Sequence, residues 1–187
     1  MNAAILEQKE AYREVNAITG SAGSVIFGTQ SFSGLPVAEL VQDFGLNISV
    51  CNRSVEEATL KDAFDLLDEC VYELHPHKVF LNFGETDLNR PDFDQERFIA
   101  EYEQLIQKTH EGGKRTVYII PVLSTKPEAE RLNLALRALA ERTGSCYVDV
   151  ADIFQFEKPR VRLFSELTNY MREGRMSFSE AMQAYGF

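Results

Sequence analysis

The sequence has little positive charge. Its 187 residues include 19 Lys and Arg against 29 Asp and Glu, which gives a formal net charge of −10, and no block of basic residues is present. Because a protein that tracks phosphates needs a basic stripe, nucleic acid and anionic membrane surfaces are poor partners. No apolar run reaches the roughly 18 residues of a membrane span, and the first 20 residues lack the basic start and apolar centre of a signal peptide. We therefore expect a cytoplasmic protein without a membrane span.

Cysteine and histidine are also scarce, with three of each. Cys51, Cys70 and Cys146 lie in apolar stretches without zinc-type spacing, so we expect buried thiols in a reducing compartment. His75 and His77 flank a proline in "ELHPHKVF", where solvated histidines are commoner than a two-point metal site. The sequence therefore predicts no bound metal and no cofactor.

Short β-rich runs alternate with longer helical patterns, which is typical of βαβ units and a parallel sheet. A chain of this length with 44% hydrophobic residues is expected to bury one core, so residues 1–187 are predicted to form a single domain. The predicted strands are 24–27, 48–51, 78–83, 116–122 and 146–150, and the predicted helices are 37–43, 60–73, 94–110 and 127–142.

This pattern predicts an α/β fold, a three-layer α/β/α sandwich around a five-stranded parallel sheet with the flavodoxin-like strand order 2-1-3-4-5. In such sheets, ligands bind outside the carboxyl ends of the strands, near the point where the strand order reverses. The loops at that edge are 28–36, 52–59, 84–93, 123–126 and the segment after residue 150. Any binding or catalytic site is expected there.

Three of these loops carry motifs of one family. The stretches are "VIFGTQSFSGLPVAEL", "ISVCNRSVEEATLKD" and "VFLNFGETDLNRPDF". They resemble the first three sequence blocks of the SGNH or GDSL hydrolases, in particular the small bacterial acylhydrolases similar to platelet-activating-factor acetylhydrolase. The resemblance spans most of the chain and implies the sandwich fold above, with Ser31 as the nucleophile of an ester hydrolase. Asn133 also fits the penultimate helix of that family.

Departures from the family pattern fall on its functional positions. Thr29 and Gln30 stand before Ser31, where the family has Gly and Asp. Ser54 replaces the oxyanion glycine of the second block, and Glu56 and Glu57 replace small residues beside it.

The third and last blocks depart as well. Thr86 replaces the oxyanion asparagine of the third block, although Gly84 and Asp87 remain. The last block, which carries the acid and the histidine of the triad, is best matched by Glu173 and Met176.

The chemistry of serine explains why these departures matter. A serine hydroxyl is a weak nucleophile unless a neighbouring base takes its proton. His75, His77 and His110 all lead into the amino ends of predicted strands, whereas Ser31 follows a carboxyl end. Loss of the triad histidine costs roughly 10⁶ in turnover, and loss of an oxyanion donor roughly a further 10² to 10³.

The candidate residues leave alternatives open. Ser31 is either a residual nucleophile or, as we favour, a turn serine that caps the following helix. Glu85 and Asp87, with the acids at 56 and 57, either form a carboxylate base or cation site or, as we favour, are solvated loop acids. An acid at position 87 can also bond loop backbone and hold the shape of the cleft.

Two functions follow from this sequence. We favour a hydrolase-like protein that is catalytically impaired or inactive and retains its cleft for ligand binding, or its surface for assembly. The alternative is an active serine esterase, with the Ser31 amide and the Thr86 hydroxyl as oxyanion donors and Glu85 or Glu173 as an unconventional base. In either case Thr29, Gln30, Gly84, Glu85 and Asp87 are predicted to line the cleft, and a small ester, lipid or carbohydrate is the expected ligand.

The C-terminal region is more apolar than a capping helix requires. We expect it to close the core rather than to form a homodimer contact, which the sequence also allows. The residues concerned are Phe154, Phe156, Leu163, Phe164, Leu167, Tyr170 and Met171.

Overall fold

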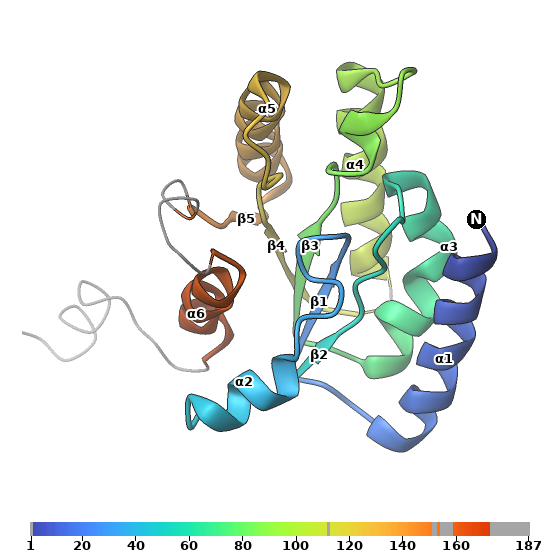
Figure 1. Cartoon of the computed structure of the whole chain (residues 1–187), viewed down its shortest axis with the longest axis vertical. Helices are drawn as coiled ribbons and strands as arrows, with labels where there is room; N and C mark the ends of the chain where they lie inside the picture. The colour runs from blue at the N-terminus through green and yellow to red at the C-terminus, as the bar shows by residue number, and fades with distance from the viewer. Residues whose placement is uncertain (1, 112, 151–152, 154–158, 173–187) are drawn as a thin grey trace, which may run out of the picture.

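Five parallel strands in the order β2-β1-β3-β4-β5 form the centre of the molecule, as the computed structural model shows (Figure 1). The structure describes residues 2–111, 113–150, 153 and 159–172. The strands are β1 (Ser24–Gly28), β2 (Val50–Asn52), β3 (Lys78–Asn82), β4 (Thr116–Ile119) and β5 (Cys146–Tyr147). The helices are α1 (Ala3–Thr19), α2 (Val37–Asp43), α3 (Leu60–Cys70), α4 (Gln95–Glu111), α5 (Pro127–Thr143) and α6 (Pro159–Met171), with 3₁₀ turns η1 (Tyr72–Leu74) and η2 (Asp87–Asn89).

The predicted fold class and strand order are confirmed, but α1 and α6 were not among the predicted helices, and α3 ends at Cys70 rather than at position 73. Helix α2 has the predicted limits, whereas β4 ends three residues before the predicted position 122 and β5 ends three residues before 150. Beyond each of these strand ends, one further backbone hydrogen bond links the chain to the neighbouring strand. Ile120 N–H donates to the Leu81 carbonyl, and Val148 N–H donates to the Ile119 carbonyl. The apolar runs therefore extend beyond the regular ladder.

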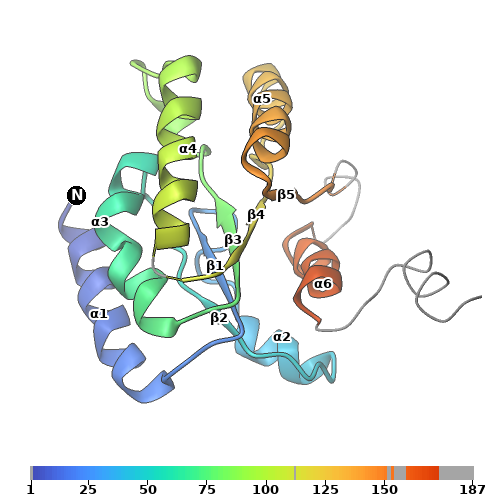
Figure 2. The same cartoon turned by 180° about the vertical axis from the view of Figure 1, so that it is seen from behind.

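Alternating side chains of the central strands fill two separate apolar layers. Val25 and Phe27 pack with α1, α3, α4 and α5 on one face, while Ile26 and Phe80 pack with α2 and α6 on the other. This alternation is expected, because successive strand side chains point to opposite faces of a sheet. Figure 2 shows the sheet and the helices on its two faces from behind.

Helix α6 closes the second layer. Leu163, Phe164, Leu167 and Met171 are buried against β1, β3 and β4, which confirms for these residues that the C-terminal region completes the core. The Lys78 ammonium group donates to the carbonyls of residues 170, 171 and 172 at distances of 2.8, 3.2 and 3.4 Å, which satisfies the free acceptors at the end of the helix. Phe154 and Phe156 lie outside the described residues.

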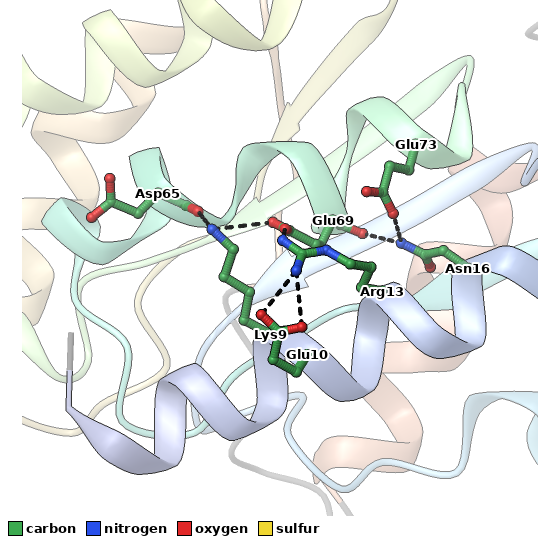
Figure 3. Close-up of polar contacts among 7 residues, drawn as sticks. All are labelled: Lys9, Glu10, Arg13, Asn16, Asp65, Glu69 and Glu73. Atoms are coloured by element: carbon green, nitrogen blue, oxygen red, sulfur yellow. Dashed lines mark hydrogen bonds and ion pairs between the residues drawn. The ribbon is translucent and has the colours of Figure 1, made fainter.

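Helix α1 is fastened to α3 by a buried carboxylate (Figure 3). The Glu69 side chain is 2% exposed and forms ion pairs with Arg13 and, at 3.5 Å, with Lys9. From the same helix, the Tyr12 hydroxyl donates to the Ser54 carbonyl at 2.7 Å. Helix α1 therefore supports the loop that follows β2, which is one of the loops at the ligand-binding edge of the sheet.

The cysteines are free thiols. Cys70 is buried, and this burial raises its thiol pKa well above the ordinary value, while Cys51 and Cys146 are partly buried. The expectation of buried thiols therefore holds fully only for Cys70. Among the described residues, no helix is long and apolar enough to cross a membrane.

Candidate functional site

Ser31 lies in the turn that follows β1. Both its hydroxyl and its backbone amide donate hydrogen bonds to the side chain of Glu85, which lies in the loop after β3. The Ser31 hydroxyl donates to Glu85 Oε1, and the Ser31 backbone N–H donates to Glu85 Oε2 at 3.1 Å. The turn itself is closed by the Thr29 carbonyl, which accepts from the amides of Phe32 at 3.1 Å and Ser33 at 3.0 Å. One carboxylate therefore binds both the hydroxyl and the amide of the predicted nucleophile.

The favoured interpretation of Ser31 as a helix cap is wrong. The residue that precedes α2 is Pro36, and within the described part of the chain no side chain caps this helix. Ser31 is too far from the first turn of α2, because five residues separate it from that helix, and its hydroxyl is directed to Glu85 instead.

Glu85 is a partly buried acid, so its description as a solvated loop acid is also wrong. Burial raises its carboxyl pKa above the ordinary value. The bonds from Ser31, a hydrogen bond from the Leu123 backbone and the nearby charge of Arg160 oppose that increase. These opposing contacts stabilise the ionised carboxylate at this position.

Arg160 joins this site from the start of α6, and sequence reasoning missed it. Its Nε donates to the Ser31 carbonyl at 2.9 Å, and its Nη2 donates to the Ser33 carbonyl. The two contacts join positions more than 120 residues apart in the chain. No local motif marks Arg160, so only the placement of α6 against the β1 face reveals it.

A cavity of about 380 Å³ opens beside Ser31 and Glu85. Its described lining contains two cations, Lys126 and Arg160, and a single acid, Glu85. The lining residues are Gln30, Ser31, Glu85, Leu88, Asn89, Leu123, Ser124, Lys126 and Arg160. The structure therefore places the predicted cleft residues Gln30 and Glu85 together with Ser31 at one cavity.

Thr29 and Gly84, two other predicted cleft residues, lie outside the described lining of this cavity. Thr29 is buried and its hydroxyl has no hydrogen-bond partner among the described residues. Gly84 has φ of +124°, and a Cβ there would lie 2.6 Å from a methyl carbon of Val122. Only glycine fits this close approach of the β3 and β4 loops without rearrangement.

Ser54 and Thr86, at the predicted oxyanion positions, lie outside the described cavity lining. Ser54 is buried, its N–H donates to the Asn52 side chain at 3.1 Å, and its hydroxyl has no partner among the described residues. Asn52 also donates to the Phe32 carbonyl at 2.8 Å, which ties this loop to the Ser31 turn. Thr86 is partly buried and immediately precedes η2.

Asp87 faces α3 rather than the Ser31 cavity. Its two carboxylate oxygens accept from the Leu60 amide at 3.1 and 3.2 Å, at the first turn of α3. Burial raises the Asp87 pKa from 3.8 to about 6. The interpretation as a solvated acid is therefore wrong for Asp87, whereas Glu56 and Glu57 are exposed.

The histidines are at the other edge of the sheet. His77 N–H donates to the Gly23 carbonyl at 3.0 Å and its carbonyl accepts from Thr116, so it sits at the amino ends of β1 and β4. His75 precedes the same strand edge, and His110 lines a surface cavity together with His77. Ser31 lies beyond the carboxyl end of β1, and the five residues of that strand alone span about 13 Å. Glu173 and Met176 lie outside the described residues.

Comparisons with known proteins place the fold. No family model and no curated protein matches the sequence. A Streptococcus pneumonia protein provisionally described as a platelet activating factor matches with a TM-score of 0.78 and 17% identity, over 90% of this chain and 93% of that one. A GDSL-like lipase from Bacteroides thetaiotaomicron matches with a TM-score of 0.68 and 15% identity, over 87% and 96%.

A third solved structure extends this likeness to an esterase of known substrate type. The acetylxylan esterase Axe2 from Geobacillus stearothermophilus matches with a TM-score of 0.60 and 17% identity, over 90% of this chain and 96% of that one. At these identities the comparison establishes the fold, which is that of the SGNH and GDSL hydrolases. Among the described residues, no group of three or more His, Cys, Asp or Glu side chains could hold a metal ion.

Proposed function

We propose that this chain, which has the fold of the GDSL-type acylhydrolases, binds a small polar ligand in the Ser31 cavity and does not hydrolyse esters through Ser31. The observation that carries the proposal is the double contact of the Glu85 carboxylate with the Ser31 hydroxyl and amide. The cavity of about 380 Å³ is large enough for a small molecule.

The Glu85 contact conflicts with acyl transfer at two points. In a serine hydrolase, backbone N–H groups near the nucleophile stabilise the oxyanion that develops on the substrate carbonyl. Here Glu85 Oε2 accepts from the Ser31 N–H, so the donor is engaged and a negative charge stands where the oxyanion would develop. A substrate carbonyl would be repelled from this position instead of being polarised.

The positions of the histidines support the same proposal. The chain has three histidines, and all three are at the amino edge of the sheet. Without an imidazole, the conventional route for removing the Ser31 proton is missing, and that loss costs roughly 10⁶ in turnover.

The test is an ester panel combined with a covalent probe. Wild type, Ser31→Ala and Ser33→Ala are compared on nitrophenyl esters of two to eight acyl carbons and for labelling by a fluorophosphonate. Ser33 lies in the same turn and serves as the matched control. We expect three equal rates near background and no labelling. Turnover or labelling that Ser31→Ala abolishes and Ser33→Ala preserves would refute the proposal.

A second candidate function, an active esterase with Glu85 as the general base, rests on a specific contact. The Ser31 hydroxyl already donates to Glu85 Oε1, and burial raises the Glu85 pKa towards the range of a useful base. In that case kcat/KM rises with pH as Glu85 loses its proton, and Glu85→Gln abolishes turnover. Equal activity of the Glu85→Gln variant and wild type would reject this candidate.

A further inference from the structure

Donors from two different segments converge on the Glu85 carboxylate, and a cation from a third segment lies nearby. The Ser31 hydroxyl and amide approach from the β1 loop, and the Leu123 backbone approaches from the loop after β4. The Arg160 guanidinium group contacts the carbonyls of the same turn from α6 and adds positive charge nearby. Backbone and hydroxyl donors arranged in this way are the usual groups that bind an external oxyanion.

We propose that these donors form an anion-binding site, that Glu85 fills it from within, and that the ligand of the cavity carries a carboxylate that displaces Glu85. This inference rests on the proposed ligand-binding function and names its ligand class. A carboxylate on a ligand presents the same two oxygens to the Ser31 donors that Glu85 presents.

The charges around the cavity favour an anionic occupant. Among the described lining residues, Glu85 is the only acid, whereas Lys126 and Arg160 are cations. Movement of Glu85 out of the site would leave two positive groups around the cavity in a chain with a net charge of −10. The Lys126 ammonium group is held at the cavity by Asn89, whose side-chain oxygen accepts from it. A neutral ester can accept a hydrogen bond from either cation, but only an anion also neutralises their charge.

The test removes the internal carboxylate and offers an external one. Acetate is titrated into wild type, Glu85→Gln and Glu85→Ala, with the Ser31 and Leu123 amide signals followed by ¹H–¹⁵N NMR. Chloride at equal ionic strength and acetamide, the neutral isostere of acetate, are the ligand controls. Glu56→Ala removes an exposed acid from a neighbouring loop and is the matched protein control.

We expect acetate to bind Glu85→Ala at least about tenfold more tightly than wild type, because removal of the internal carboxylate frees charge-assisted hydrogen bonds. The acetate affinity of Glu85→Gln should lie between those of Glu85→Ala and wild type, since the glutamine amide satisfies the Ser31 donors only partly. If Glu85→Ala does not fold, the comparison of Glu85→Gln with wild type still decides. Glu56→Ala should match wild type. Equal acetate affinity in all four proteins, or equal responses to acetate and acetamide, would overturn the proposal.

The role of the flanking cations is tested in the Glu85→Ala background, or in Glu85→Gln if Glu85→Ala does not fold. Lys126→Gln should weaken acetate binding about threefold, the effect of one exposed charge. Lys114→Gln, at the opposite edge of the sheet, should leave it unchanged. Equal affinities in these two variants would exclude Lys126 from the site.

Failure of this inference is distinguishable from failure of the proposed function. Absent acetate binding leaves the ester and fluorophosphonate results untouched. Ester turnover that depends on Ser31 refutes the proposed function regardless of the result of the acetate titration.

Discussion

Replacement of Asp87 by asparagine is expected to stabilise the protein at neutral and alkaline pH. Asp87 is 8% exposed, and its carboxylate accepts from the Leu60 amide at 3.1 and 3.2 Å. Burial disfavours the charged form and raises its pKa from 3.8 to about 6. Asparagine has nearly the same shape, keeps an oxygen acceptor for Leu60 and carries no charge to desolvate.

The sign and magnitude follow from proton linkage. A pKa that is higher in the folded state than in the unfolded state means that the protonated form supports folding. That support is complete below pH 3.8 and is lost as pH rises through about 6. The difference between the two pKa values corresponds to about 3 kcal/mol at 1.36 kcal/mol per pKa unit. Asp87→Asn should therefore unfold with a free energy about 1 to 3 kcal/mol higher than wild type at pH 8, and nearly the same at pH 3.5.

The assay is urea unfolding followed by far-UV circular dichroism at pH 3.5, 5, 6, 7 and 8. The gap between Asp87→Asn and wild type should open between pH 4 and pH 7, with equal m-values. Glu57→Gln, at an exposed loop acid, is the control for a general change in net charge. A variant that is less stable than wild type at pH 8 would refute the reasoning, because it would mean that the attraction of the α3 N-terminus for an anion exceeds the cost of burying it.

Three further substitutions test the packing behind the site by the same unfolding assay. Gly84→Ala should lower the free energy of unfolding by about 2 to 4 kcal/mol, because its Cβ would lie 2.6 Å from Val122 at a positive φ. A decrease below about 1 kcal/mol would contradict this close approach. Asn133→Ala should lower the free energy of unfolding by about 2 to 4 kcal/mol, since the Asn133 side chain forms hydrogen bonds with the N–H and the carbonyl of Val122 at 2.7 and 3.0 Å. An unchanged free energy of unfolding would mean that water replaces these bonds. Leu163→Ala should lower the free energy of unfolding by about 2 to 5 kcal/mol, because Leu163 anchors α6 in the core. An unchanged urea midpoint would show that α6 is not an integral part of the core.

The fold could be predicted because its signals are local. The alternation of apolar strands and helical patterns, together with glycines at helix ends, identifies each βαβ unit without knowledge of distant contacts. Gly144, for example, follows α5 with φ of +70°, a left-handed conformation that glycine adopts readily at the end of a helix. Apolar pattern alone does not mark the ends of β4 and β5, because the apolar residues after them continue into buried backbone that is no longer part of the regular ladder.

The site could be predicted only in part, because its contacts are not local. Family resemblance pointed to Ser31, yet the Glu85 contact spans 54 residues and the Arg160 contact spans 129. Composition suggested that an acid in so acidic a chain is solvated, and that rule fails at Glu85 and Asp87. Whether a loop acid is buried depends on which loops close over it, and the sequence alone does not specify that packing.

The segment from Gly84 to Asp87 explains how one loop holds two acids in different roles. Glu85 lies in the turn that precedes η2, whereas Asp87 is the first residue of η2, and the two side chains reach different elements. Glu85 therefore reaches the Ser31 turn, while Asp87 reaches the first turn of α3. The contact of Asp87 with Leu60 fixes the loop to a helix of the core, and the fixed loop in turn determines where the Glu85 carboxylate lies. The backbone position from which Glu85 reaches the Ser31 donors is thus set by the same contact that fixes the loop to the core, while the Glu85 side chain itself can leave those donors.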